Sequence, residues 1–389
     1  MDEAKLHAQV SAHLTELAVY IGSRPTGSEG NHRAGEYIQQ VLTEFGWEVE
    51  TQRFECLTWQ AGEAHLTGPG PVFALTPNPY SMAFDGEGLL VILRTLADLE
   101  RVGDLSGQIA VLTAELSQYS YMPKNFPFFR SDDQQRVIEL LEAKQPAAVL
   151  GYLNAPLFCD ADFLLPSATI APEFAEVVQY LDGQPVHLSI SGRTIPTDGY
   201  NVVARSREMD GPKIILCAHY DTWFDTPGAL DNGSGVSALL TLAGVLDQET
   251  YPLELVFFNG EDHYAAPGQV AYLSDFDPDE AAYVINMDGI GAVGKHNSLA
   301  LFGDDPFLFD AAYRVQEQFP NLEEVPAWYE SDHTMFVQQG LAALAFSSAN
   351  AYDLWNVVTH TQRDRFEQVD IAQVAEVVQF IEALFAAVG

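Results

Sequence analysis

Short apolar runs alternate with segments of helical periodicity through the second half of the chain. The runs lie at 214–218, 255–258 and 283–287, and apolar residues recur at helical spacing over 233–248, 307–318 and 369–387. Runs this short between helices are typical of buried strands in parallel sheets. The pattern therefore predicts an α/β fold, with a mostly parallel mixed sheet and helices on both faces.

The first 200 residues divide into two parts with different patterns. Helical spacing recurs from Leu6 to Leu17 and from Ala34 to Phe45, before a strand-like stretch at 47–54. From Cys56 to Thr197 the chain is rich in Pro and Gly, with short apolar runs and one helical stretch, 134–143. This change predicts an inserted β-rich module at 56–197 within a discontinuous domain formed by 1–55 and 198–389.

Composition narrows the class of protein and its partners. The chain has 389 residues, 47% of them hydrophobic, which suffices for a buried core. With 55 acidic and 18 basic residues the formal charge is −37, so we expect neither nucleic acid nor a membrane as a partner. The charge fits a high-salt environment or simple solubility equally well, and the oligomeric state is not readable.

Cysteine usage and the chain's first residues bear on location. The three cysteines are widely spaced and odd in number, which argues against a disulfide framework. There is no charged-then-apolar leader, and no apolar stretch approaches the ~20 residues of a membrane span. We therefore expect a soluble cytoplasmic protein, or a secreted one if a leader has been removed.

Acidic and imidazole side chains stand just beyond the predicted strands. His219 follows the first run, the pair Glu261 and Asp262 follows the second, and Asp288 ends the third. Ligands of open α/β sheets bind beyond the carboxyl ends of the strands, so these side chains should converge. Asp231 and His360 add a carboxylate and an imidazole to the set.

We interpret this set as a two-metal hydrolytic site, in which one carboxylate bridges two ions and each ion has its own His and carboxylate. Asp231 would bridge, His219 with Asp288 would hold one ion, and Asp262 with His360 would hold the other. These donors suit zinc and would also accept cobalt or manganese. Glu261 is left over, as the general base for an attacking water.

Each residue also has a structural explanation when taken alone. A single His at a strand end is more often hydrogen-bonded than a ligand, and the stretch 231–235 could be a turn before a helix. Asp221, two residues after His219, could accept a hydrogen bond from that imidazole, and Asp364 could do the same for His360. The combination of residue types favours the metal site over chance.

These motifs, in this order, resemble the co-catalytic zinc aminopeptidase family, which also includes glutamate carboxypeptidases, glutaminyl cyclases and inactive receptor relatives. The matching stretches are 21–28, 201–204, 218–222, 228–235, 258–262, 286–288 and 360–364. The resemblance implies a zinc-exopeptidase fold, two zinc ions and an aminopeptidase acting on peptides with a free N-terminus. It also implies a cis peptide bond between Asp231 and Asn232. Residues 56–197 are similar to the family's protease-associated insert.

Several departures from the family pattern, and several alternatives, bear on function. Asp262 stands where Glu is usual, and Thr359 stands where many members have an oxyanion-stabilising Tyr, so Tyr352 or the metal would have to serve. A carboxypeptidase would need a cation such as Arg363 or Arg365. A single-zinc glutaminyl cyclase would not need His219, and a non-catalytic binding module would have lost the base or a ligand.

Overall fold

The computed structural model describes residues 2–207 and 211–388, which form two compact units. One unit comprises 1–56 and 197–389, and the other comprises 57–196. Strands β1 (Glu48–Thr67) and β7 (Pro185–Arg205) each have residues in both units. Two strands therefore carry the chain out to the inserted module and back. The identity of this module as a protease-associated domain stays a prediction.

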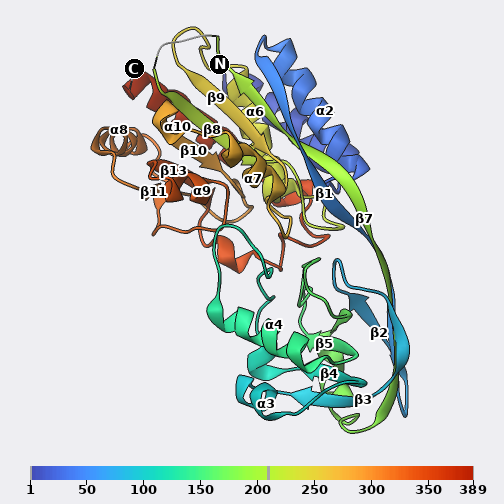
Figure 1. Ribbon diagram of the computed structural model, residues 1–389. Helices are drawn as coiled ribbons and strands as arrows, with labels where there is room; N and C mark the ends of the chain where they lie inside the picture. Colours follow the sequence, from blue (N-terminus) through green and yellow to red (C-terminus); the bar gives the residue numbers. More distant parts are fainter. Residues whose placement is uncertain (1, 208–210, 389) are drawn as a thin grey trace. The chain divides into compact units, whose positions relative to one another are not determined.

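A mixed sheet with a parallel centre forms the middle of the larger unit (Figure 1). In spatial order its strands are β7, β9 (Leu253–Phe258), β8 (Lys213–His219), β10 (Ala281–Met287), β13 (Ala343–Ser348), β11 (Asn297–Phe302) and β12 (Glu323–Glu324). The four central strands β9, β8, β10 and β13 are mutually parallel. β7 and β11 run antiparallel to their central neighbours. The predicted mostly parallel mixed sheet is confirmed.

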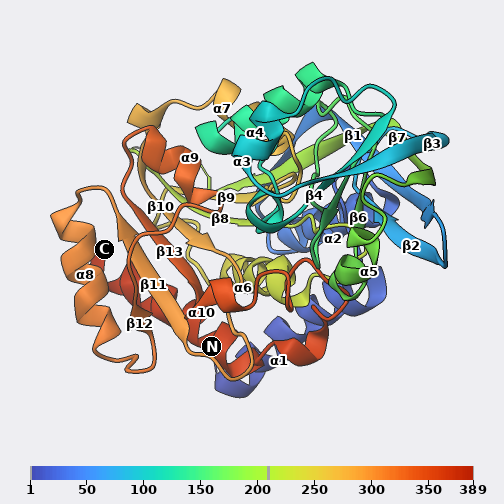
Figure 2. The same cartoon turned by 90° about the horizontal axis from the view of Figure 1, so that it is seen from below.

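Helices cover both faces of this sheet, as expected (Figure 2). On one face lie α1 (Glu3–Thr15), α6 (Ser234–Ala243) and α10 (Ile371–Val388), with α2 (Glu29–Glu44) and α8 (Pro306–Gln316) packed against α6 and α10. On the other face lie α7 (Pro267–Ser274) and α9 (His333–Gln338). Alternate strand residues point to opposite faces, so that Phe257 joins the α6 side while Phe258 contacts Tyr272 and Phe336.

Helix α10 is longer and more apolar than a typical surface helix. Its 18 residues have a mean hydropathy of 1.7, which is enough by length and composition to cross a membrane, and the sequence-based expectation of no such stretch was wrong. Core helices of soluble proteins meet the same criterion. The buried side chains of α10, among them Phe380 and Leu384, belong to the core of the larger unit.

The inserted unit combines strands with short helices. Its elements are β2 (Val72–Pro77), β3 (Phe84–Leu93), α3 (Leu96–Arg101), β4 (Gln108–Leu112), α4 (Asp132–Lys144), β5 (Ala148–Tyr152), β6 (Ser167–Ile170) and α5 (Ala175–Gln179). Strands β3, β4, β5 and β6 are parallel to one another, whereas β7 and β2 run antiparallel to the outer two, β3 and β6. Two separate clusters of buried apolar residues pack within the unit. The module therefore has an α/β architecture in which strands predominate.

Two expected elements have different limits in the structure. The strand expected at 47–54 continues as β1 to Thr67, because its later residues pair with β2. The helix expected at 233–248 is shorter, since α6 ends at Ala243 before the cap residue Gly244. Both differences arise from pairing or capping that apolar periodicity does not record.

Truncating Phe380 in α10 should destabilise the larger unit. Its ring is fully buried between Phe346 and Phe319, with centroid distances of 5.3 and 5.4 Å. Phe380→Ala should lower the free energy of unfolding by about 3–5 kcal/mol, because it removes buried apolar surface and leaves a cavity. Phe307→Ala on α8 is the matched control, since that ring is 64% exposed. Equal losses in the two variants, measured by denaturant unfolding, would contradict this packing.

Candidate metal centre

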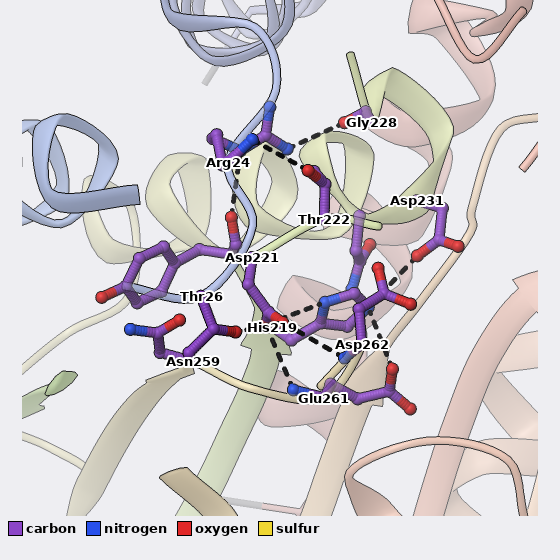
Figure 3. A network of polar contacts seen from close by, with 12 residues as sticks. Arg24, Thr26, His219, Asp221, Thr222, Gly228, Asp231, Asn259, Glu261 and Asp262 are labelled. Atoms are coloured by element: carbon purple, nitrogen blue, oxygen red, sulfur yellow. Dashed lines mark hydrogen bonds and ion pairs between the residues drawn. The ribbon is translucent and has the colours of Figure 1, made fainter. Parts of the chain in front are cut away.

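The acidic and imidazole residues singled out from the sequence converge at the carboxyl ends of the central strands. His219 ends β8, Asp288 directly follows β10, and Glu261 with Asp262 lies in the turn after β9. Asp231 belongs to the irregular turn before α6, and His360 to the segment before α10. Figure 3 shows His219 lying among Asp221, Asp231, Glu261 and Asp262.

Two groups of possible ligands share one carboxylate. In the first, His219 Nε2 lies 3.2 Å from Asp231 Oδ1 and 3.5 Å from Asp288 Oδ1. In the second, His360 Nε2 lies 3.2 Å from Asp231 Oδ2 and 3.1 Å from Asp262 Oδ1. The ligand atoms of each group lie within 4.8 Å of one another. Asp231 thus offers one oxygen to each group, the position that the sequence predicted for a bridging ligand.

The chemistry of these donors fits zinc. His219 is fully buried, and neither of its ring nitrogens makes a well-aligned hydrogen bond within the described residues. Asp262 Oδ2 is also buried without a hydrogen-bond partner there. Imidazole nitrogens and carboxylate oxygens at this spacing are the ligands that zinc prefers in hydrolytic sites. Burial lowers the pKa of the His219 imidazole, but Asp288, Asp221 and Asp231 outweigh burial and raise this pKa well above its usual range.

Glu261 belongs to neither group of ligands. Its Oε2 lies 4.0 Å from His219 Nε2, and 22% of its side chain is exposed. Burial, followed by repulsion from Asp262 and Asp288, raises the pKa of Glu261 well above its ordinary value. A carboxylate with this environment, adjacent to but outside the ligand set, is suited to accept a proton.

Asp221 positions both His219 and the turn that carries Glu261. Its Oδ1 lies 3.5 Å from His219 Nδ1, as the sequence suggested. It also accepts hydrogen bonds from the backbone N–H groups of Glu261, at 3.2 Å, and Asp262, at 3.1 Å. Thr26 Oγ1 donates to it at 3.0 Å. One buried carboxylate therefore connects the ends of β8 and β9, which makes Asp221 a positioning residue.

Asp364 serves a different purpose from the one expected. Instead of pairing with His360 it accepts hydrogen bonds from the backbone N–H groups of Leu230, at 2.6 Å, and Asp231, at 3.0 Å. It thereby fixes the backbone of the shared ligand. Burial and the neighbouring Asp231 raise the pKa of Asp364 to about 7. The Asp231–Asn232 peptide bond is cis, which confirms the expectation.

Aromatic side chains surround His360. Trp223 stacks on its ring at a centroid distance of 5.1 Å and an interplanar angle of 12°. Trp355 Nε1 donates a hydrogen bond to His360 Nδ1 at 2.9 Å. Tyr352, considered as an oxyanion donor, is 60% exposed and its hydroxyl donates to Glu330 at 2.7 Å. That role for Tyr352 is not supported.

Asp288 is oriented by a chain of buried polar groups. Ser331 Oγ donates to Asp288 Oδ2 at 2.6 Å, and Asn286 Nδ2 donates to Ser331 Oγ at 2.9 Å. Oδ1 is the Asp288 oxygen that faces His219. His333 lies beside this chain, 3.3 Å from Asn286, and burial lowers its pKa to about 4. It is therefore near the site but outside both ligand groups, as expected.

Arg24 is the site residue that sequence reasoning missed. It is fully buried, and its guanidinium donates only to backbone carbonyls in the salt bridges and hydrogen bonds of the described residues. The acceptors are Leu17, Gly22, Tyr220, Pro227 and Gly228, at 2.8–3.0 Å. Three of these, Tyr220, Pro227 and Gly228, lie between His219 and Asp231 in the sequence, and Figure 3 shows the bond to Gly228. Arg24 therefore fixes the separation of the two ligands.

Gly228 allows this close arrangement. Its φ is +60°, and a Cβ there would meet Thr222, the Asp231 carbonyl and the Arg24 guanidinium. Only glycine fits both the backbone conformation and the space.

Comparison with known proteins agrees with the motifs. Residues 201–385 match Peptidase family M28. The resemblance to the zinc aminopeptidase superfamily is confirmed. An aminopeptidase of Pseudomonas aeruginosa is 23% identical to this chain over 366 residues. The match covers 82% of this chain and 66% of the relative, so the chain spans just under two thirds of that protein.

Solved structures of zinc aminopeptidases and glutaminyl cyclases share the fold of this chain. BSAP, a zinc aminopeptidase from Bacillus subtilis, superposes with a TM-score of 0.76 at 18% identity, covering 97% of this chain and 94% of that one. A glutaminyl cyclase from Porphyromonas gingivalis superposes with a TM-score of 0.51 at 16% identity, covering 98% of each chain. Similarity at this level of identity establishes the fold alone.

Removing the Arg24 guanidinium should destabilise the segment between His219 and Asp231. Arg24→Met leaves five carbonyls without their donor, so the free energy of unfolding should fall by about 3 kcal/mol or more. Arg24→Lys, which keeps the charge but has fewer donors, should lose less. Arg33→Met on the exposed side of α2 is the control. If denaturant unfolding showed the same loss of stability for Arg24→Met and Arg33→Met, the structural role given to Arg24 would be wrong.

The stability of the metal-free protein should fall as the pH rises from about 4, the ordinary pKa of a carboxyl group, to about 7. Burial raises the pKa values of Asp332 and Asp364 to about 7 and that of Glu261 well above its usual range. In this window the folded state binds protons that the unfolded chain has lost, so stability is present at low pH and is lost as these groups ionise. Thermal unfolding in a chelator measures this. Asp332→Asn should reduce the slope; a melting temperature that rises with pH would contradict the prediction.

Proposed function

We propose that this protein is a metal-dependent aminopeptidase that hydrolyses N-terminal residues from peptides. The proposal rests on the position of Asp231, whose two carboxylate oxygens face two different ligand groups, while Glu261 lies outside both groups. Relatives named aminopeptidases support it. Zinc is the ion that the donors and the named relatives favour, with two ions per chain.

The two ions, when bound, would acidify an attacking water and polarise the carbonyl of the scissile bond. Glu261 would act as the general base, taking the proton of that water and delivering it to the leaving amine. Burial and the neighbouring carboxylates raise the pKa of Glu261 above its ordinary value, which makes its carboxylate a better proton acceptor. Asp221 would hold the Glu261 turn in place through the two backbone N–H groups that it accepts.

The charge of the site favours a free α-amine over a carboxylate at the recognised end of the substrate. The groups nearest the proposed metal position are carboxylates, and Arg24 is buried with its donors engaged by backbone carbonyls. Arg363 and Arg365, the cations considered for a carboxypeptidase, are both exposed, and Arg365 Nε donates to the Gln362 carbonyl. A carboxypeptidase would need one of them to bind a C-terminal carboxylate beside these carboxylates, so the charge favours the aminopeptidase.

Two other functions are less well supported. A glutaminyl cyclase would need only one zinc, whereas both ligand groups are complete here. A non-catalytic binding module would be free to lose the base, whereas Glu261 is present and supported by Asp221. The partner would be a peptide for both of these functions.

Replacing Glu261 tests the proposal directly. Glu261→Gln keeps size and polarity but cannot accept the proton, so turnover of a leucyl anilide should fall roughly 100- to 10,000-fold with metal content unchanged. Elemental analysis should find about two zinc ions per chain in both proteins, the number the proposed site requires. Glu323→Gln on the exposed strand β12 is the matched control.

Substrate blocking separates the alternatives. An aminopeptidase should cleave peptides with an amidated C-terminus and leave N-acetylated peptides intact, whereas a carboxypeptidase should show the reverse. Conversion of an N-terminal glutaminyl peptide to a cyclic product without cleavage would indicate the cyclase. If the metal-loaded protein turned over none of these peptides, the enzyme proposal would be wrong and the binding module would be favoured.

A further inference from the structure

Glu330 is an exposed carboxylate that hydrogen bonds hold through one oxygen only. Its Oε2 accepts from the Tyr352 hydroxyl at 2.7 Å and from the Tyr329 N–H at 2.9 Å. In the part of the chain that the structure describes, Oε1 accepts no hydrogen bond and no side chain forms a salt bridge with Glu330. The carboxylate is therefore oriented, while its other oxygen and its charge are available to a ligand.

On one side, Glu330 adjoins the first ligand group of the metal centre through its neighbour in the chain. Ser331 follows it directly and donates to Asp288 Oδ2 at 2.6 Å. The turn that carries Glu330 is closed by the buried His333, whose Nε2 lies 2.8 Å from the Trp328 carbonyl oxygen. Glu330 therefore lies at the rim of the site, one residue from a side chain that contacts a proposed metal ligand.

On the other side, aromatic rings connect Glu330 to the second ligand group. The centroid of the Tyr352 ring lies 6.3 Å from that of Trp355, and the Trp355 ring lies 5.9 Å from that of His360. Tyr352 and Trp355 are 60% and 44% exposed, and Tyr329 is 50% exposed. Exposed aromatic side chains gathered beside a candidate active site are typical of a surface that binds a ligand.

An oriented carboxylate beside exposed aromatic rings is suited to a cation. The stems of Lys and Arg pack along apolar surface while the charged end reaches a polar partner, and aromatic faces attract cations. In the proposed reaction the α-amine and the scissile carbonyl lie at the metal centre, so the N-terminal side chain must lie against its rim. Glu330 is outside both ligand groups, so metal ions would leave its charge available to that side chain.

We propose that Glu330, with Tyr352 and Trp355, forms a subsite for a cationic N-terminal side chain, so that the enzyme prefers peptides that begin with Lys or Arg. This inference rests on the aminopeptidase activity of the proposed function. Tyr352 is a positioning residue of the subsite, because its hydroxyl holds Oε2 and turns Oε1 outwards. An N-terminal Leu would contact the rings and leave the charge of Glu330 without a partner.

Two substrates that differ in one charged group test the subsite. Lysyl and norleucyl anilides share a four-carbon stem, and only the lysyl side chain ends in an ammonium group. In the wild type, kcat/KM should be higher for the lysyl substrate. Glu330→Gln should lower the ratio of the two kcat/KM values roughly three- to tenfold, mainly through KM, because it removes one charged hydrogen-bond acceptor at an exposed position. Tyr352→Phe should lower the ratio less, since Tyr329 still holds Oε2.

Glu323→Gln is the matched control, because it removes the same charge from the exposed strand β12. It should leave the ratio unchanged, which separates a local contact from the negative field of the whole chain. A lysyl substrate that is no better than the norleucyl one, or a ratio that Glu330→Gln does not change, would overturn the subsite and leave the aminopeptidase proposal intact.

Binding gives a second readout that does not depend on catalysis. In calorimetric titrations of the metal-loaded protein, lysinamide should bind more tightly than norleucinamide, and Glu330→Gln should remove most of the difference. If the protein cleaves neither anilide, the proposed function is wrong and these titrations still decide the subsite. Equal affinity of the wild type for the two amides would overturn it.

Discussion

The concentration of carboxylates at one end of the parallel strands is the constraint on which the site depends. Asp221, Asp231, Glu261, Asp262, Asp288, Asp332 and Asp364 all lie close enough to influence one another's ionisation or that of His219. Buried carboxylates are costly unless a cation or a proton compensates them. Arg24 is a buried cation, but its guanidinium contacts backbone carbonyls. It therefore offsets the charge of the carboxylates only from a distance. The carboxylates of the site must therefore bind protons or metal ions. The raised pKa values of Glu261 and Asp262 show that, without an ion, these two groups hold their protons more strongly than usual.

The topology of the larger unit explains why these carboxylates meet. Strands β9, β8 and β10 are adjacent and parallel, so the residues after each strand reach the same edge of the sheet. Asp231 comes from the turn before α6, where a helix N-terminus favours negative charge. Backbone groups complete the arrangement, since Asp364 binds the N–H of Asp231 and Asp221 binds those of Glu261 and Asp262. The positions of the ligands therefore depend on hydrogen bonds between distant segments as much as on the strands.

Short apolar runs were sufficient to predict three of the four central strands, β8, β9 and β10, and with them the convergence of His219, Asp288 and the Glu261–Asp262 pair. Arg24 could not be found in this way, because its partners are backbone carbonyls, which every residue carries. The role of Asp364 was mispredicted for a related reason. A separation of four residues from His360 suggested a contact, but Asp364 turns towards the Leu230 and Asp231 backbone. The N–H donor of Trp355 depends on the conformation of a loop with left-handed residues, which sequence periodicity does not encode.

The two departures from the family pattern fall on the same half of the site. Asp262 is one methylene shorter than the usual Glu, yet its Oδ1 reaches within 3.1 Å of His360 because Asp221 binds its backbone N–H. Thr359 takes the place of the usual Tyr, and its hydroxyl is directed to the Leu354 carbonyl at 3.5 Å. The other half, His219 with Asp288, is held by Asp221 and Ser331 in the orientation that ligation requires. The two ligand groups therefore differ in how their side chains are held, even though they share Asp231.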